Sequence, residues 1–465
     1  MASRALSNRQ IARAALVIVL GFVASGVLGL LRTWAFSVTF GASTALDSFY
    51  AARQLPEALF VLVAGGALGS SFIPVFERFL AKGEGDAAWR LASAVMTCVF
   101  LLGAGLALLL AIFAPLIVPP LLEPGEPPAT QALTTALTQI MLITVAIFGV
   151  SGLLMGILNA QRVFLLPALA LSMNNIGQIL GAFVLTRLLS TDGTPSIYGL
   201  AWGAVLGALL HLLVQTPGLR RAGAKLRILP SLAVPGVREV LLLMGPRMLG
   251  LGVVQINFIV NVNLTAGMVE GSRVALVTAW TLMFFLLGVI GQSVGSALFP
   301  SLSALAAAGD HTGYRNRLNR ALLGVVGVSI PAMIAVWTLG AWGIDLVFGY
   351  GEWTPEATLA TAAALSWFAL GIPGHAALEV LSRAFYALSD TRTPVAVSVV
   401  SMTANILLSL ILIRLVGDPT SLTNGAFVGL AMANSVTTLV EAAALWLLLR
   451  RKLRAIPENA ENLGL

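Results

Sequence analysis

Several ionisable side chains stand inside long apolar stretches of this 465-residue sequence, and five of them form a candidate site: Arg32, Asp47, Arg53, Glu57 and Arg247. An ionisable residue within a membrane-spanning segment costs at least about 2.5 kcal/mol on insertion scales, so such residues tend to pair with one another or line a cavity. Guanidinium groups bind phosphate oxygens in a bidentate manner. The set therefore predicts a cationic cavity wall in which the three arginines contact the phosphates of an anionic substrate.

The spacing of two of these residues leaves an alternative open. Arg53 and Glu57 are four residues apart, so on a helix they share a face and can neutralise each other. A local ion pair, or anchoring at the membrane interface, is then an alternative to substrate binding. Arg32 has no acidic residue near it in the sequence, which favours a binding role. We expect Asp47 and Glu57 to organise the cavity around the arginines.

The sequence carries no signature of an enzyme. It contains no Gly-x4-Gly-Lys-Ser/Thr phosphate loop. The three histidines, His211, His311 and His375, lack the spacing of metal ligands, and a single cysteine, Cys98, excludes an internal disulfide. We therefore predict no catalytic residue, no metal site and no bound cofactor. His211 and His375 are expected to be hydrogen-bonded packing residues, with a proton relay as the alternative.

The composition indicates a membrane protein with many spans. Hydrophobic residues make up 58% of the sequence, charged residues make up 10%, and the mean hydropathy is +0.93. The second apolar segment of each half is too long for one straight crossing, so we expect it to be kinked or extended. Apolar runs between Gly, Pro and polar residues predict twelve helices, at 13–36, 46–80, 90–118, 130–158, 165–189, 197–217, 237–266, 272–305, 318–348, 356–388, 394–416 and 425–449.

The distribution of basic residues predicts the orientation of these spans. With the N-terminus in the cytoplasm, most of the 27 lysines and arginines fall in cytoplasmic loops and at the two termini, whereas Arg187, Arg273 and Arg414 fall on the outer side. This is the positive-inside pattern, so both termini are expected to be cytoplasmic. The net charge of +7 is then a signal of topology, and we predict no nucleic-acid partner.

The two halves of the sequence resemble each other. The pattern Gly-x3-Gly-Ser-x3-Pro at 65–74 returns at 291–300, and Gly-Leu-Ala at 199–201 returns at 429–431. Collinear repeats at nearly one spacing indicate an internal duplication. Membrane proteins built from two similar halves are usually transporters with the site at the interface of the halves.

The duplication predicts the fold class and the domain boundaries. Because each half has six predicted spans, both halves enter the membrane in the same orientation. We expect an all-α membrane protein of two parallel six-helix lobes, related by a pseudo-twofold axis along the membrane normal. The N-terminal lobe is predicted at 1–217, a cytoplasmic linker at 218–236, and the C-terminal lobe with a short basic tail at 237–465.

Several strings are similar to one known family. FYALSDTRTP at 385–394 resembles the turn between the tenth and eleventh helices of the MviN/MurJ lipid II flippases, and GILNAQRVFLLPALA at 156–170 resembles the turn between their fourth and fifth helices. LFPSL at 298–302 also matches, and the resemblance extends over essentially the whole chain. It implies the fold of the multidrug/oligosaccharidyl-lipid/polysaccharide exporter superfamily, with an alternating-access cavity between two lobes.

The resemblance also implies a substrate and its surroundings. A member of this family moves lipid II, the undecaprenyl-pyrophosphate-linked peptidoglycan precursor, from the inner to the outer leaflet of the bacterial cytoplasmic membrane. Its expected partners are this lipid, the surrounding membrane lipids and proteins of cell-wall synthesis. Either Na+ or the membrane potential would drive the movement. Arg32 matches the arginine of the family's first helix, and Asn405 matches the asparagine of a sodium site. Asn261 and Ser409 fall where some members have acids assigned to that site.

The sequence departs from the family pattern at several positions. Gly26, Phe60, Val61 and Thr281 stand where typical members have arginines. The predicted twelve helices also leave out the last two that line a lipid-tail groove in typical members. Two alternatives to a lipid II flippase follow: an exporter of another lipid-linked oligosaccharide or of a drug, or a MurJ-like scaffold in a cell-wall complex that does not transport. A drug exporter is expected to have a cavity of acids and aromatics, which the arginines disfavour.

Overall fold

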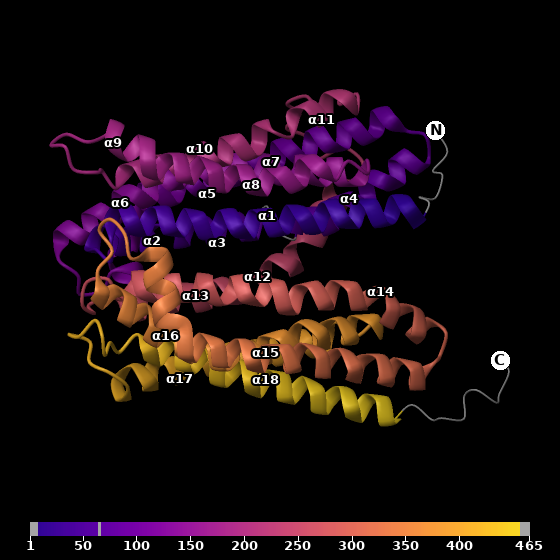
Figure 1. The fold of residues 1–465 in the computed structure, drawn as a ribbon. Coiled ribbons are helices and arrows are strands. Elements are labelled where there is room, and N and C mark those ends of the chain that lie inside the picture. Colours follow the sequence, from indigo (N-terminus) through magenta and orange to yellow (C-terminus); the bar gives the residue numbers. More distant parts are fainter. Residues whose placement is uncertain (1–7, 64–66, 456–465) are drawn as a thin grey trace. The chain divides into compact units, whose positions relative to one another are not determined.

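The structure is a computed structural model that describes residues 8–63 and 67–455, except for the side chains of 8–20, 22, 63, 67–70, 246–247, 249–250, 253, 289, 292–293, 296–297 and 455. The described chain is almost entirely helical (Figure 1). It divides into two compact units, Met1–Gly267 and Met268–Leu465.

The helices of the first unit follow the predicted spans, several of which are built from more than one segment. In Figure 1, α1, α8, α10 and α7 run side by side, in agreement with their packing contacts. In chain order the helices are α1 (Asn8–Phe40), α2 (Thr44–Ala52), α3 (Gln54–Val63), α4 (Ala67–Ala81), α5 (Gly85–Leu122), α6 (Pro128–Met141), α7 (Ile143–Ala160), α8 (Leu165–Leu180), the π-helix η1 (Gly181–Leu185), α9 (Thr186–Leu188), α10 (Tyr198–Leu213), α11 (Thr216–Arg221) and α12 (Val237–Thr265).

The predicted irregularity of the second span is confirmed. Ser43 caps α2 by accepting a hydrogen bond from the backbone N–H of Leu46 at 3.3 Å, and α2 ends at Ala52. Arg53 then separates α2 from α3, so the span is broken at the position of a predicted site residue. The equivalent span of the second half is interrupted by a π-helical turn at Gly288–Gln292. In contrast, the third span is longer than predicted, because α5 continues through Pro115 and Pro119 to Leu122.

A stripe of glycines brings α10 close to α8 and η1. A Cβ placed on Gly203 would lie 2.7 Å from Cα of Gly181, and one on Gly207 would lie 2.6 Å from the carbonyl oxygen of Asn174. Real Cβ atoms do not approach this closely, so the two backbones touch where side chains would otherwise separate them. This is the close packing by small residues that is typical of membrane helices.

The stretch predicted as a linker packs as part of the first unit. Its backbone N–H groups at Arg227 and Leu229 donate to the hydroxyls of Ser93 and Thr97 on α5, at 3.1 and 2.9 Å. Gly236 has φ +90°, which favours glycine, and α12 begins directly after it. α12 packs against α3, α4 and α5. The compact units thus divide at Gly267, after α12, whereas the lobe boundaries predicted from the duplication stay a prediction.

The second unit is built around α16, which contacts α13, α14, α15 and α18 (Figure 1). Its buried core joins Leu318, Leu381, Phe385, Leu445 and Leu449 of three helices. The unit contains α13 (Ser272–Leu287), the π-helix η2 (Gly288–Gln292), α14 (Ser293–Ala307), α15 (His311–Phe348), α16 (Pro355–Ala387), α17 (Arg392–Leu415) and α18 (Val428–Ala455).

Nine helical stretches in the described part of the chain are long and apolar enough to cross a membrane. The three predicted spans outside this set are 46–80, 237–266 and 272–305, of which the first and third are interrupted helices. Large apolar side chains remain exposed on the long helices, among them Leu116 at 72% and Leu323 at 75%. Such side chains favour a surrounding of lipid over water.

Candidate substrate-binding site

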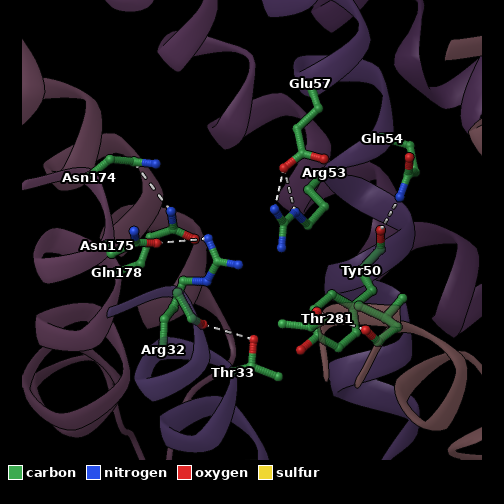
Figure 2. A network of polar contacts seen from close by, with 12 residues as sticks. Arg32, Thr33, Tyr50, Arg53, Gln54, Glu57, Asn174, Asn175, Gln178 and Thr281 are labelled. Atoms are coloured by element: carbon green, nitrogen blue, oxygen red, sulfur yellow. Dashed lines mark hydrogen bonds and ion pairs between the residues drawn. The ribbon is translucent and has the colours of Figure 1, made fainter. Parts of the chain in front are cut away.

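Arg32 is held on α1 by an amide of a neighbouring helix. Its Nη1 donates to Oδ1 of Asn175 on α8 at 3.1 Å (Figure 2). The Nδ2 of Asn175 in turn donates to the carbonyl and the hydroxyl of Ser25, at 3.2 and 3.3 Å. Because α1 and α8 pack along their lengths, this chain of contacts orients the guanidinium from two helices.

The guanidinium of Arg32 keeps unused donor capacity. Its Nε is buried and has no hydrogen-bond partner among the described residues. Arginine has five N–H donors and no acceptor, and a buried donor without a partner carries a desolvation cost of about 1–3 kcal/mol. A polar ligand oxygen at this position would remove that cost. Arg32 is therefore arranged as a binding group that its own helix neighbours do not saturate.

Arg53 lies at the break between α2 and α3 and forms an ion pair with Glu57. Its Nε donates to Oε1 of Glu57 at 2.8 Å, and Nη2 contacts the same oxygen. The Arg53 side chain is 16% exposed and that of Glu57 is 45% exposed, so the pair has a buried and an open side. The guanidinium also lies 6.0 Å from the ring centroid of Tyr50. The local ion pair that the spacing allowed is thus present.

The two arginines belong to one polar cluster of the first unit. Arg32 is close enough to Arg53, Tyr50 and Glu57 to interact with them electrostatically, and Figure 2 shows both guanidinium groups pointing into the same region. Two guanidinium groups that face one region, only one of them paired with a carboxylate in the described part of the chain, leave a net positive charge. Such a cluster attracts an anion, and the bidentate geometry of arginine suits phosphate.

The two remaining predicted residues of this site are Asp47 on α2 and Arg247 on α12. Asp47 is in the first turn of α2, where a carboxylate is favoured by the helix dipole, and it acts electrostatically on Tyr50. The backbone of Arg247 belongs to α12, and its side chain lies outside the described residues. The structure therefore brings Arg32, Arg53 and Glu57 together. The binding role of all five residues stays a prediction.

Two members of the cluster are not among the predicted site residues. Asn175 supplies the acceptor for Arg32, and the hydroxyl of Tyr50 is buried with no hydrogen-bond partner among the described residues. Asn175 lies 143 positions from Arg32, so no local spacing connects the two. Tyr50 stands three residues before Arg53, on the same helical face, and that spacing is a signal that could have identified it.

The second unit holds a separate group of polar side chains. Arg383, which falls within the predicted span 356–388, lies inside α16, donates to the backbone carbonyl of Glu379 at 2.7 Å and pairs with its carboxylate. On the same helix, Nε2 of His375 is 3.1 Å from Oδ1 of Asn434 on α18. Glu441 of α18 accepts from the hydroxyl of Ser398 on α17 at 2.5 Å. Glu379, Arg383 and Glu441 are therefore engaged by neighbouring residues.

The residues implied for an ion site fall in both units. Asn261 is on α12 and donates to the carbonyl and side-chain oxygens of Asn257, each at 3.0 Å. On α17, Nδ2 of Asn405 donates to the Thr437 hydroxyl at 3.2 Å, and Ser409, one turn further on, has a buried hydroxyl with no partner among the described residues. Asn261 belongs to the first unit, whereas Asn405 and Ser409 belong to the second, and the ion site stays a prediction.

The histidine interactions match the expected packing roles. In the first unit, Nδ1 of His211 is 2.6 Å from the Ser151 hydroxyl, and Gln215 donates to that hydroxyl at 2.8 Å. The ring of His211 also packs on that of Phe148, with the ring centroids 5.3 Å apart. No group of three or more His, Cys, Asp or Glu side chains placed to hold a metal ion occurs in the described part of the chain.

A helical membrane fold with a cationic polar cluster between its helices is the arrangement expected of a transporter of charged or polar substrates. Comparison with solved structures supports the fold. The fold is similar to an inward closed lipid II flippase MurJ, with a TM-score of 0.77, 23% identity and coverage of 94% of this chain and 87% of the other. It is also similar to an inward-facing multidrug resistance MATE transporter of the MOP superfamily, with a TM-score of 0.75, 14% identity and coverage of 92% and 95%.

Sequence comparison identifies the family. The profile of the family described as lipid II flippase MurJ matches residues 36–462. The lipid II flippase MurJ of Burkholderia cenocepacia is 28% identical over 455 residues, with coverage of 94% of this chain and 84% of the relative. A probable lipid II flippase MurJ of Synechocystis is 29% identical over 460 residues, with coverage of 96% and 83%. The chain belongs to the lipid II flippase MurJ family, and it is a multi-pass membrane transporter rather than an enzyme.

Proposed function

We propose that the chain moves lipid II from the inner to the outer leaflet of the bacterial cytoplasmic membrane. The observation that carries this proposal is the family match over residues 36–462, together with a cationic cluster in the first unit. Lipid II has a pyrophosphate that needs positive charge and a polyprenyl tail that can stay in the bilayer. No covalent bond changes, so the protein has to bind, shield and release the head group.

The arginines of the cluster supply the recognition of phosphate. Arg32 keeps a buried Nε free of hydrogen bonds to described residues, and Arg53 lies at a helix break beside it. In this proposal the pyrophosphate oxygens accept a hydrogen bond from the Nε of Arg32. They also compete with Glu57 for the guanidinium of Arg53. Arg247 is the third proposed phosphate contact, while Asp47 and Glu57 keep the cluster from binding anions too tightly to release them.

The test is lipid II flipping by the purified protein in liposomes. Arg32→Ala and Arg53→Ala should each lower the flipping rate by about tenfold or more, because each removes a charge-assisted contact of about 1.5–3 kcal/mol. Arg227→Ala, a loop arginine outside the cluster, serves as the matched control and should flip at the wild-type rate. Wild-type rates in both cluster variants would show that the cavity is assigned to the wrong residues.

We also propose that the net movement is driven by Na+ or by the membrane potential. Na+ prefers oxygen ligands, and the buried hydroxyl of Ser409 lacks a partner among the described residues. The membrane potential acts on any cationic cavity that changes its exposure across the bilayer. Liposomes with an imposed Na+ gradient, or with a potassium diffusion potential and no Na+, separate the two drivers. Asn405→Ala and Ser409→Ala should remove only the Na+ response.

A second candidate function is a scaffold for cell-wall synthesis proteins that does not transport. The substitutions that favour it are Gly26, Phe60 and Thr281, which stand where typical members have arginines. Complementation of a bacterium depleted of its own flippase distinguishes the two. A transporter restores growth, and its Arg32→Ala variant restores less growth at equal expression. If the chain is a scaffold, neither the wild type nor the Arg32→Ala variant restores growth.

A further inference from the structure

We propose that the second unit carries a binding site for the headgroup phosphate of an anionic phospholipid, at the basic ends of α15 and α18. A cavity of about 190 Å³ lies there, lined by three arginines, an asparagine and a tryptophan: Arg315, Asn319, Trp446, Arg450 and Arg454. This cavity is within the second unit and contains none of the residues assigned to lipid II recognition.

The spacing of the lining residues follows one face of each helix. On α15 the residues are Arg315 and Asn319, which are four positions apart. On α18 they are Trp446, Arg450 and Arg454, also at intervals of four. Residues at this spacing lie above one another on a helix, so each helix contributes a continuous polar row. The two rows face a common cavity instead of being scattered over the surface.

The floor of the cavity is apolar and the rim is cationic. Leu449 is 1% exposed, and Leu318 and Leu453 are 4% exposed, so these leucines close the cavity from below. Arg450 and Arg454 are exposed at the rim. An apolar floor beneath a cationic rim suits the glycerol and phosphate portions of a lipid headgroup.

Two contacts hold two of the three arginines in place. The guanidinium of Arg450 lies over the ring of Trp446, 4.5 Å from its centroid. Arg315 reaches from α15 to donate to the backbone carbonyl of Leu453 near the end of α18. That bond ties the two helices together, and it occupies a carbonyl whose partial negative charge would repel an anion.

The nearby carboxylates do not neutralise the rim. Asp310 caps α15 by accepting from the N–H of Gly313 at 2.7 Å, and Asp390 binds Lys452 at 2.6 Å. Among the described residues, no carboxylate lies within salt-bridge distance of Arg450 or Arg454. Both guanidinium groups are therefore available to an external anion.

The position on the unit favours a lipid over free phosphate. Below the basic end, α18 exposes large apolar side chains, including Val440 at 63% and Leu447 at 51%. Tryptophan is enriched at the membrane interface, where Trp446 would lie if these side chains face acyl chains. Basic pockets between membrane helices on the cytoplasmic side bind lipid headgroups, and each arginine near an anionic surface contributes about 1 kcal/mol.

Native mass spectrometry of the full chain can test the site. Protein in detergent would receive equal amounts of phosphatidylglycerol and phosphatidylcholine, with retained lipid measured for wild type, for the pocket variant Arg450→Gln/Arg454→Gln, and for the control variant Arg317→Gln/Arg451→Gln. The control also removes two positive charges, one from the basic end of α15 and one from that of α18, at exposed residues that do not line the cavity. We expect wild type and control to prefer phosphatidylglycerol, and the pocket variant to bind it about fivefold more weakly for each arginine removed.

Three results would overturn the proposal. Equal weakening in the two variants would mean that net charge alone attracts the lipid. Equal retention of phosphatidylglycerol by the wild type and the pocket variant would remove the site. Displacement of phosphatidylglycerol by millimolar inorganic phosphate would assign the cavity to a soluble anion. Arg450→Lys distinguishes the geometry further, because lysine keeps the charge but binds phosphate as a point charge, and it should recover only part of the affinity. Since the readout is binding, a failure of lipid II transport would leave this result unaffected.

Discussion

At the scale of single residues, Arg32 depends on a neutral partner. The Oδ1 of Asn175 accepts from its Nη1 at 3.1 Å, while its Nε stays unpaired among the described residues. A neutral amide orients a guanidinium without cancelling its charge, whereas a carboxylate would do both. Arg53 has the opposite arrangement, because Glu57 already neutralises it. The two arginines therefore differ in how readily they accept a phosphate.

This difference predicts that Asn175→Asp impairs transport without unfolding the protein. A carboxylate at this position would bind Arg32 in an ion pair, and hydrogen bonds between ionised groups are roughly twice as strong as neutral ones. We expect lipid II flipping in liposomes to fall by about tenfold, with an unchanged or higher melting temperature. Asn174→Asp adds the same charge one residue away and should have a smaller effect. Wild-type flipping by Asn175→Asp would contradict a phosphate-binding role for Arg32.

A second prediction concerns Asp390, in the turn between α16 and α17. Its carboxylate accepts from Lys452 at 2.6 Å and from the backbone N–H of Thr393 at 3.1 Å, and the Lys452 hydrogen bond is the largest of the causes that lower the pKa of Asp390 from 3.8 to about 2. A carboxylate with a lowered pKa stabilises the fold at pH values above its unfolded pKa, and this stabilisation is lost as the pH falls through the folded pKa. Because the Lys452 side chain is 40% exposed, the contribution should be at most about 1 kcal/mol.

Thermal unfolding in detergent between pH 6 and pH 2 checks this prediction. Wild type should melt at a higher temperature than Asp390→Asn near pH 6, and the difference should shrink as the pH falls from about 4 to about 2. A difference that stays constant over the whole range would mean that the ionised carboxylate does not contribute.

At the scale of elements, the glycine stripe of α10 sets the distance to α8 and η1. We predict that Gly203→Ala destabilises the protein by about 1–3 kcal/mol, since its Cβ would lie 2.7 Å from Cα of Gly181 and force the backbones apart. Gly105→Ala on α5 is the matched control, because its Cβ would meet open space and alanine favours a helix. Melting temperatures of the two variants give the comparison. Equal melting temperatures would show that α10 can shift without cost.

The helices could be predicted from the sequence because each segment that spans a bilayer needs a long run of apolar residues, which is visible in the sequence. The start of α12 after Gly236 and the close contact at Gly203 both follow from composition and spacing. Hydrogen-bond partners that are far apart in the sequence have no comparable pattern. The bond from Arg32 to Asn175 depends on how α1 packs against α8, and the docking of Leu229 on Thr97 depends on an extended backbone.

At the scale of the whole molecule, the charge distribution predicts how the chain is oriented in the membrane. Short loops at alternate helix ends carry basic residues, such as Lys82 before α5, and Arg90 lies near the start of α5. The intervening loops carry acidic residues, such as Asp192 and Glu352. By the positive-inside rule, we predict that the first set faces the cytoplasm together with both termini. The proposed direction of lipid movement depends on this orientation, because the cavity must receive lipid II from the inner leaflet.

Single cysteines can test the orientation directly. After Cys98→Ala removes the one native cysteine, Thr191→Cys and Glu352→Cys should react with a membrane-impermeant maleimide in intact spheroplasts, because both positions are exposed in loops predicted to face outward. Lys82→Cys and Ala308→Cys, which are exposed at the opposite helix ends, should react only after the membrane is opened. The reverse labelling pattern would invert the topology, and the basic cavity at α15 and α18 would then face the outer leaflet. Labelling of all four positions in intact cells would instead mean that at least one of the predicted spans between them does not cross the membrane.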